Sequence, residues 1–154
     1  MKKEMNNKGF SLVELIIVVA IMAVLIGVLA PAYLQYVEKS KKTKDCSAVG
    51  SIMDAAEIVA ADPAITWEAG EQLQVAVGAE GATYSGGAGK KVVEQMQSIV
   101  AESDAQITGS WGGITFEAQK QDNGTVKFQY MSGKMDVKAI EEVTPSLAVR
   151  FETK

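Results

Sequence analysis

The chain has 154 residues, a formal net charge of −4 and no histidine. A chain of this length is predicted to form one domain, alone or with an appendage. The absence of histidine excludes a Ser-His-Asp triad and any imidazole metal ligand. With Cys46 as the one cysteine, neither an internal disulfide nor a cysteine zinc site can form. The acidic balance makes nucleic acid a poor default partner, and we expect no cofactor and no metal.

The apolar residues are concentrated near the N-terminus. Residues 1–9, MKKEMNNKG, are polar. Residues 10–30 are apolar except for Ser11, Gly27 and one charged residue, Glu14. About 20 such residues match the hydrocarbon core of a bilayer, so residues 10–30 are predicted to be a transmembrane helix. A secretory signal peptide is the first alternative, but its apolar region is shorter, about 7–15 residues. A simple membrane anchor is the second, but it does not explain a carboxylate that costs about 2.5–3.5 kcal/mol to insert.

The lysines on the two sides of the apolar run predict opposite orientations of the chain in a membrane. Lysines in residues 1–9 favour a cytoplasmic leader with the rest of the chain outside. Lys39, Lys41, Lys42 and Lys44 follow the run and favour the reverse.

The residues around Gly9 resemble a known motif. The sequence KGFSLVEL at residues 8–15 is similar to the processing motif of type IV pilins and pseudopilins. The resemblance covers about the first 50 residues and decides for an outside head domain. It implies cleavage between Gly9 and Phe10 by a prepilin peptidase, which then N-methylates Phe10. Glu14 becomes the fifth residue of the mature chain, the position of a glutamate shared by the family.

The resemblance also implies a function. The protein would be a structural subunit of a type IV pilus rather than an enzyme, polymerised through its N-terminal helix. Its partners would be other copies of itself, the peptidase and methyltransferase, and the assembly platform protein with its ATPase. It would rest in the cytoplasmic membrane as a single-pass precursor and then enter an extracellular filament. Glu14 would pair with the α-amino group of a neighbour's Phe10 and set the axial register; the alternative is a carboxylate that protonates in lipid.

The helix is predicted to continue beyond the membrane. Ala48, Ile52, Ala55 and Val59 follow helical spacing, and Asp62-Pro63 ends the helix. Residues 10–61 would form one long helix, with residues 45–61 packing on a head domain of residues 62–154. Gly27 and Pro31 are the predicted site of a helix kink, and the family often has a proline at the latter position.

The head is predicted to be small and mixed, which gives an α+β fold with a long N-terminal helix packed on an antiparallel sheet, as in pilins. Residues 62–89 are interpreted as a long loop with a short strand at 73–77, and residues 90–103 as a helix. Alternation predicts strands at 114–118 and 126–130 around the turn Asp122-Asn123-Gly124. A third strand is expected after Pro145, from the alternation of Leu147, Val149 and Phe151.

Three smaller features stay open. The turn at 122–124 is interpreted as a hairpin, with a calcium loop as the alternative. Cys46 is interpreted as a small buried hydrophobe; many pilins close a C-terminal disulfide that this chain cannot form. Residues 38–44 hold four lysines and one glutamate, whereas residues 45–154 hold 16 acidic and 8 basic residues, a net charge of −8. The lysines could meet acidic heads of neighbours or lipid headgroups.

Two other functions are compatible with the sequence. The first is a pseudopilin of a type II secretion or DNA-uptake system, whose N-terminus would look the same. The second is a single-pass membrane protein that displays a binding head without forming a polymer. Twitching, adhesion, DNA uptake, secretion and electron transfer place too few demands on one subunit for the sequence to choose among them.

Overall fold

A computed structural model describes residues 10–101 and 105–152. The chain divides into two compact units, Met1–Val37 and Glu38–Lys154. We describe the first as the N-terminal unit and the second as the head. The boundary between them falls inside a helix, so the head includes the C-terminal part of that helix.

The helix α1 runs from Leu12 to Ala61 and contains 50 residues, with Pro31 inside it. Its N-terminal part is apolar on all sides, and its C-terminal part is amphipathic. Every buried residue of α1 lies between Asp45 and Ala60. Ile52, Ala55 and Val59 are buried and Ala48 is half-buried, so the predicted apolar face is confirmed.

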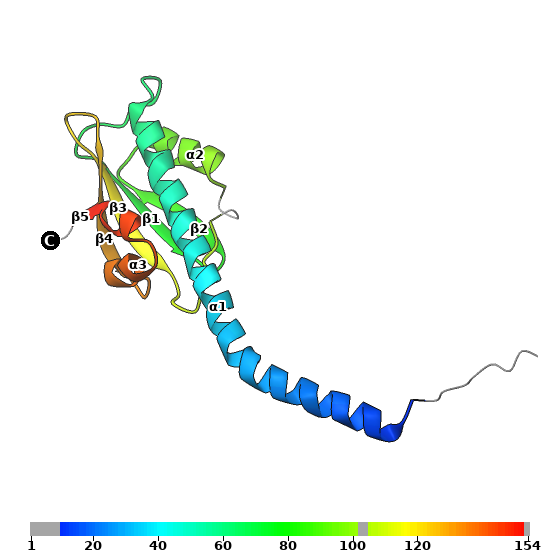
Figure 1. Cartoon of the computed structure of the whole chain (residues 1–154). Coiled ribbons are helices and arrows are strands. Elements are labelled where there is room, and N and C mark those ends of the chain that lie inside the picture. Colours follow the sequence, from blue (N-terminus) through cyan, green and yellow to red (C-terminus); the bar gives the residue numbers. More distant parts are fainter. Residues whose placement is uncertain (1–9, 102–104, 153–154) are drawn as a thin grey trace, which may run out of the picture. The chain divides into compact units, whose positions relative to one another are not determined.

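The head contains a five-stranded sheet with the order β2-β1-β3-β4-β5. Neighbouring strands are antiparallel, except that β5 runs parallel to β4. Figure 1 shows the head part of α1 lying across the sheet, which is the predicted α+β arrangement. The strands are β1 (Gln72–Gly78), β2 (Gly81–Gly86), β3 (Ile114–Lys120), β4 (Val126–Gly133) and β5 (Phe151–Glu152).

The core lies between the sheet and α1. Alternate residues of β1 and β3 are buried, as the period of a strand requires. The ring of Phe116 on β3 contacts the rings of Phe128 and Phe151 edge-on, at centroid distances of 6.2 and 5.7 Å. Burying an aromatic side chain of this kind stabilises a fold by about 1.5–3 kcal/mol, so these contacts hold the short β5 in place.

The hairpin between β3 and β4 is confirmed. The backbone N–H of Gly124 donates to the carbonyl of Gln121 at 2.9 Å, and that of Gln121 donates to the carbonyl of Thr125 at 2.8 Å. Gly124 has a φ of +83°, a conformation that glycine adopts without strain. Residues 122–124 therefore form a tight turn.

Two predictions for the head are wrong in part. Residues 62–89 hold two strands rather than one in a long loop, since β2 pairs with β1 through the turn at Gly78 and Gly81. The sequence of β2, GATYSG, has a glycine at each end and is short, so Thr83 and Tyr84 alone give too weak a strand signal. The predicted helix at 90–103 is α2, Lys90–Ile99; it ends earlier, and residues 102–104 lie outside the described residues.

The predicted third antiparallel strand is also wrong. Residues 137–148 form two short helices, α3 (Val137–Val143) and α4 (Pro145–Ala148), and only Phe151–Glu152 forms a strand, parallel to β4. Pro145 lacks an N–H and has a fixed φ, which suits the first position of a helix. Val149 is 81% exposed, so the alternation of residues 147, 149 and 151 does not mark one buried face.

Candidate functional site

The start of α1 is a reciprocal cap. The backbone N–H of Ser11 donates to Oε2 of Glu14 at 2.9 Å, and the Ser11 hydroxyl accepts from the backbone N–H of Val13 at 3.3 Å. This is a variant of the capping box, in which side chains satisfy two backbone donors at a helix start; here the hydroxyl accepts from the second helical residue instead of the third. The spacing Ser-x-x-Glu at 11–14 is the sequence signal for this cap.

The cap fixes where the Glu14 carboxylate lies. It folds back toward the N-terminus of its own helix, onto the residue that follows Phe10. A carboxylate in the first turn also interacts favourably with the positive end of the helix dipole. Phe10 is 79% exposed, and Gly9 lies outside the described residues. The predicted cleavage position and the predicted register residue are therefore close together in sequence, at the exposed start of α1.

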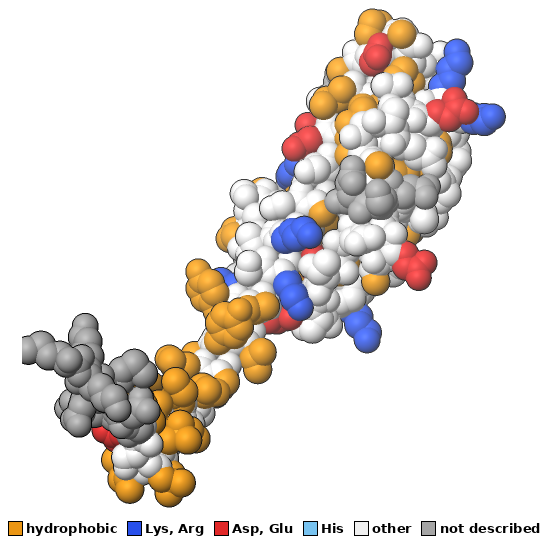
Figure 2. Space-filling view, turned by 90° about the vertical axis from the view of Figure 1, so that its right-hand side faces the viewer, with side chains coloured by type: hydrophobic (Ala, Val, Ile, Leu, Met, Phe, Trp, Pro, Cys, Tyr) orange, Lys and Arg blue, Asp and Glu red, His pale blue; other side chains and the backbone are white. Residues whose placement is uncertain are grey.

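The N-terminal unit exposes its apolar side chains. All residues from 10 to 36 are exposed, and α1 is the one helix among the described residues that is long and apolar enough to cross a membrane. Figure 2 shows the hydrophobic side chains that cover this part of α1, in contrast to the mixed surface of the head. An apolar surface this large on a helix requires lipid or other apolar helices around it.

The backbone hydrogen bond that would connect Pro31 to Gly27 in a regular helix cannot form. In a helix the N–H of residue i donates to the carbonyl of residue i−4, and Pro31 has no N–H to give to Gly27. The helix α1 nevertheless continues through both residues without a break. A Cβ added at Gly27 would meet no atom within 4 Å. The kink at this point stays a prediction.

In the head, two carboxylates of α1 hold the loop of residues 108–111. Asp45 is fully buried, and its carboxylate accepts four hydrogen bonds, from the backbone N–H and hydroxyl of Thr108, the backbone N–H of Gly109 and the indole of Trp111. Two turns earlier, Oε1 of Glu38 accepts from the backbone N–H and the hydroxyl of Ser110, both at 2.6 Å. These bonds tie α1 to a loop more than 60 residues further along the chain.

The hydrogen bonds from Ser110 hold the pKa of the Glu38 carboxyl below its ordinary value, and the charges of Lys42 and Lys41 add to this. Lys42 places its Nζ 5.3 Å from the ring centre of Trp111, a cation–π contact. Trp111 is buried and therefore packs in the head. No local sequence signal identifies the contacts of Glu38 and Asp45 with residues 108–111, because these residues are far apart in the chain.

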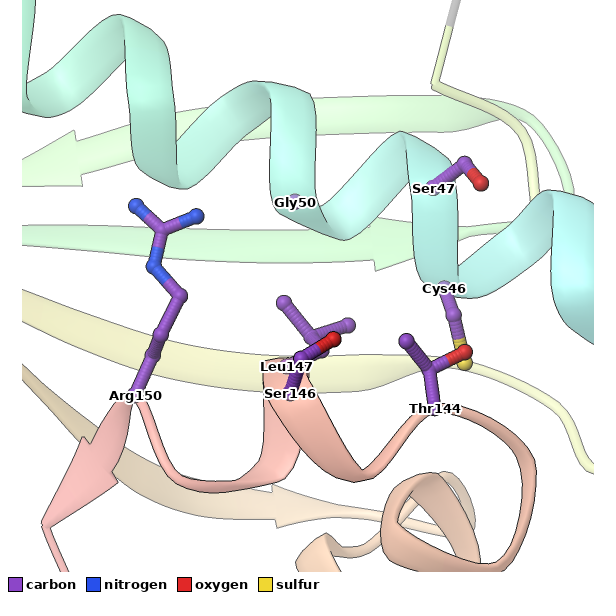
Figure 3. Close-up of a pocket in the computed structure, with 7 residues that line it drawn as sticks. All are labelled: Cys46, Ser47, Gly50, Thr144, Ser146, Leu147 and Arg150. Atoms are coloured by element: carbon purple, nitrogen blue, oxygen red, sulfur yellow. The ribbon is translucent and has the colours of Figure 1, made fainter.

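Cys46 is buried, as predicted. Figure 3 shows its sulfur pointing toward Thr144, between α1 and the segment that contains α4. Burial raises the pKa of the thiol above its ordinary value, although a hydrogen bond with Thr144 opposes the shift. The thiol is thus neutral and shielded, which suits packing rather than nucleophilic chemistry. A pocket of about 360 Å³ lies beside it, lined by Cys46, Ser47, Gly50, Thr144, Ser146, Leu147 and Arg150.

The described residues contain no group of three or more His, Cys, Asp and Glu side chains placed to hold a metal ion. Residues 122–124, for which a calcium loop is the alternative prediction, form a tight hairpin turn in the structure.

A helix part that is exposed, apolar and capped at its start by Glu14, in a chain that also has an α+β head, is typical of membrane-anchored or filament-forming subunits. Residues 5–30 match the family model described as the prokaryotic N-terminal methylation motif. The chain is 30% identical over 121 residues to the type IV major fimbrial protein FimA of Dichelobacter nodosus, covering 78% of this chain and 69% of that protein.

Two further relatives match shorter stretches. A fimbrial protein of Pseudomonas aeruginosa is 32% identical over 90 residues, covering 57% of this chain and 58% of its own length. The type IV major alpha-pilin of Moraxella bovis is 37% identical over 65 residues, covering 40% of this chain and 41% of its own. No solved structure gives a significant match. The chain belongs to the type IV pilin family.

Proposed function

We propose that the protein is a building block of a type IV pilus, cut between Gly9 and Phe10, N-methylated on Phe10 and polymerised through its N-terminal helix. The single observation that carries the proposal is the exposed apolar part of α1, which begins at the methylation motif with Glu14 folded over its first turn. A lone soluble subunit would not tolerate such a surface, whereas a bilayer or a bundle of neighbouring helices covers it.

The proposal assigns two states to one helix. In the precursor the apolar run crosses the cytoplasmic membrane, with the leader on the cytoplasmic side and the head outside. In the filament the same run packs against its counterparts in other copies. The repeated contact is heterologous and does not close, so it yields a filament rather than a ring. The peptidase and methyltransferase, the platform protein and the assembly ATPase are the partners that these steps require.

In the filament, Glu14 pairs with the new α-amino group on Phe10 of a neighbouring copy. Each charge would be unfavourable alone in an apolar core, whereas together they form a charge-assisted hydrogen bond. The cap supports this role, because it directs the carboxylate toward the end of the helix where the amino group arises. The pair would set the axial register of the subunits more than it would add net stability.

The test is mass spectrometry on filaments sheared from the cell surface and pelleted. The expected result is an abundant peptide that begins at Phe10 and carries one extra methyl group. If this peptide occurs in the membrane fraction only, the protein is a pseudopilin of a secretion or DNA-uptake system. An intact terminus at Met1 or Lys2 on the functional protein would overturn processing and leave a single-pass anchored head.

A further inference from the structure

We propose that the basic collar, defined as Lys39, Lys41, Lys42 and Lys44, docks the precursor onto anionic phospholipid headgroups of the outer leaflet of the cytoplasmic membrane. This inference rests on the proposed function, which places the precursor in that membrane with its head outside. It gives a role to lysines that the orientation of the chain leaves unexplained, since basic residues favour the cytoplasmic side.

The order of residues along α1 matches the layers of a membrane interface. Exposed aliphatic residues continue to Leu34, and Tyr33 and Tyr36 are 67% and 76% exposed. Tyrosine is enriched at the level where hydrocarbon meets headgroups, because its ring is apolar and its hydroxyl is polar. The four lysines follow directly. The sequence order is therefore the apolar run, then the two tyrosines, then the lysines. This is also the order of the bilayer core, its boundary with the headgroups and its charged surface.

The spacing of the collar suits a headgroup layer. From Lys39 to Lys44 the helix axis rises by about 7.5 Å, at about 1.5 Å per residue. The headgroup region on each side of a bilayer is roughly 5–8 Å thick, and lysine side chains extend along the helix to reach it. The collar can therefore lie within a single layer of phosphates.

Three of the four collar charges are available to a ligand, whereas Lys42 contacts the ring of Trp111. Lys39, Lys41 and Lys44 are exposed, and none of the ion pairs found among the described residues includes them. The two nearest acidic residues on α1 accept hydrogen bonds from residues 108–111: Glu38 from Ser110, and the buried Asp45 from Gly109 and Trp111. The charges of Lys41 and Lys42 also act on Glu38, which forms no ion pair among the described residues. Residues 38–44 therefore carry a net charge of +3, from four lysines and one glutamate.

The rest of the head makes this attraction directional. Residues 45–154 carry a net charge of −8, so an anionic surface repels most of the head. Attraction is confined to the collar, which adjoins the apolar run in the sequence. Anionic lipids would therefore hold the precursor by its collar while the acidic surface stays in solvent, until assembly withdraws the helix.

The experiment measures lipid selectivity of the full chain. The protein is reconstituted in bilayers of phosphatidylcholine with a minority of phosphatidylglycerol, and the preference for spin-labelled phosphatidylglycerol over phosphatidylcholine is measured by electron spin resonance. The wild type should prefer the anionic lipid, and high salt should weaken the preference. The triple variant Lys39→Gln, Lys41→Gln, Lys44→Gln should lose most of it, by about tenfold or more. The matched control is Lys91→Gln, Lys134→Gln, Lys138→Gln, which removes the same charge from exposed head positions and should keep it.

Either of two results would overturn the proposal. One is an unchanged lipid preference in the collar variant, and the other is an equal loss in the control. If lipid preference is unchanged while filaments of the collar variant become scarce and lose their salt sensitivity, the collar binds acidic heads of neighbouring subunits instead. The methylated peptide that begins at Phe10 separates this failure from that of the proposed function: a chain that is cut and methylated in cells but shows no lipid preference refutes the collar alone.

Discussion

The indole Nε1 of Trp111 donates a hydrogen bond of 2.8 Å to Oδ2 of Asp45, a residue 66 positions earlier in the chain. The carboxylate accepts from Thr108 and Gly109 as well, so it organises a loop that has no regular secondary structure. Among the described residues, no buried side-chain nitrogen or oxygen lacks a partner. The carboxylate is thus a structural hub, and its bonds connect α1 to the segment before β3.

The first prediction concerns this hub. Asp45→Ala should lower the free energy of unfolding by roughly 3 kcal/mol, because it leaves two backbone donors and the indole without their acceptor in a buried site. Urea unfolding of the full chain in detergent, followed by tryptophan fluorescence, measures the change.

The control is Asp54→Ala on the same helix. Asp54 pairs with Arg150 at 2.7 Å, but its side chain is 66% exposed. Its loss should change the free energy of unfolding by less than about 1 kcal/mol. Equal effects of the two substitutions would contradict the hub.

The second prediction uses two glycines with opposite outcomes. A Cβ at Gly109 would lie 2.7 Å from Oδ2 of Asp45 and 2.9 Å from Nε1 of Trp111. Gly109→Ala should therefore separate the two groups and destabilise the head by roughly 1–3 kcal/mol. A Cβ at Gly50, inside α1, would meet Leu147 at an ordinary 3.7 Å. Gly50→Ala should stabilise the chain by up to about 1 kcal/mol, through helix propensity.

Thermal unfolding of both variants, under one set of detergent conditions, checks the pair. If both substitutions stabilise the chain, the space around Gly109 relaxes more easily than its contacts indicate; if both destabilise it, the contact with Leu147 leaves no room for a Cβ at Gly50.

Much of the fold could be predicted from local patterns. The apolar run, the helical spacing up to Val59 and the turn at Gly124 each depend on neighbouring residues, and each is found in the structure. The strand β2 and the helices α3 and α4 are harder to predict from local patterns. They are short segments of mixed composition, and their conformation depends on packing, such as that of Ile140 and Leu147 in the core.

The candidate site divides in the same way. The residues from Gly9 to Glu14 are contiguous, so a motif identifies them, and the Ser11 cap could have been found from its spacing. The bonds of Glu38 and Asp45 to residues 108–111 are long-range. Such pairings arise from the tertiary fold, and no single sequence contains a signal for them.

The third prediction is a dependence on pH. The pKa of Glu38 is depressed in the folded chain, with hydrogen bonds from Ser110 as the main cause. A carboxyl with a depressed pKa stabilises the folded chain at pH values above its pKa in the unfolded chain, near 4.5. This stabilisation is lost as the pH falls through its pKa in the folded chain. Glu38→Gln should therefore flatten the decline of the unfolding temperature between about pH 5 and pH 3, because the amide cannot titrate. An identical decline in the variant and the wild type would contradict a role for this group.

The fourth prediction separates the two roles of Glu14. In the single chain it caps α1, and in the filament it is proposed to meet an α-amino group. A capping box accepts Gln as well as Glu, so Glu14→Gln keeps the cap but removes the charge, whereas Glu14→Ala removes both. If the charge sets the register, both variants should insert, be cut after Gly9 and yield about tenfold fewer filaments or more, since each leaves an unpaired buried ammonium. If the cap alone matters, Glu14→Gln should assemble like the wild type. Filament counts by electron microscopy, with the processed peptide measured in the same cells, distinguish these results, and wild-type filament numbers in Glu14→Ala would exclude both roles.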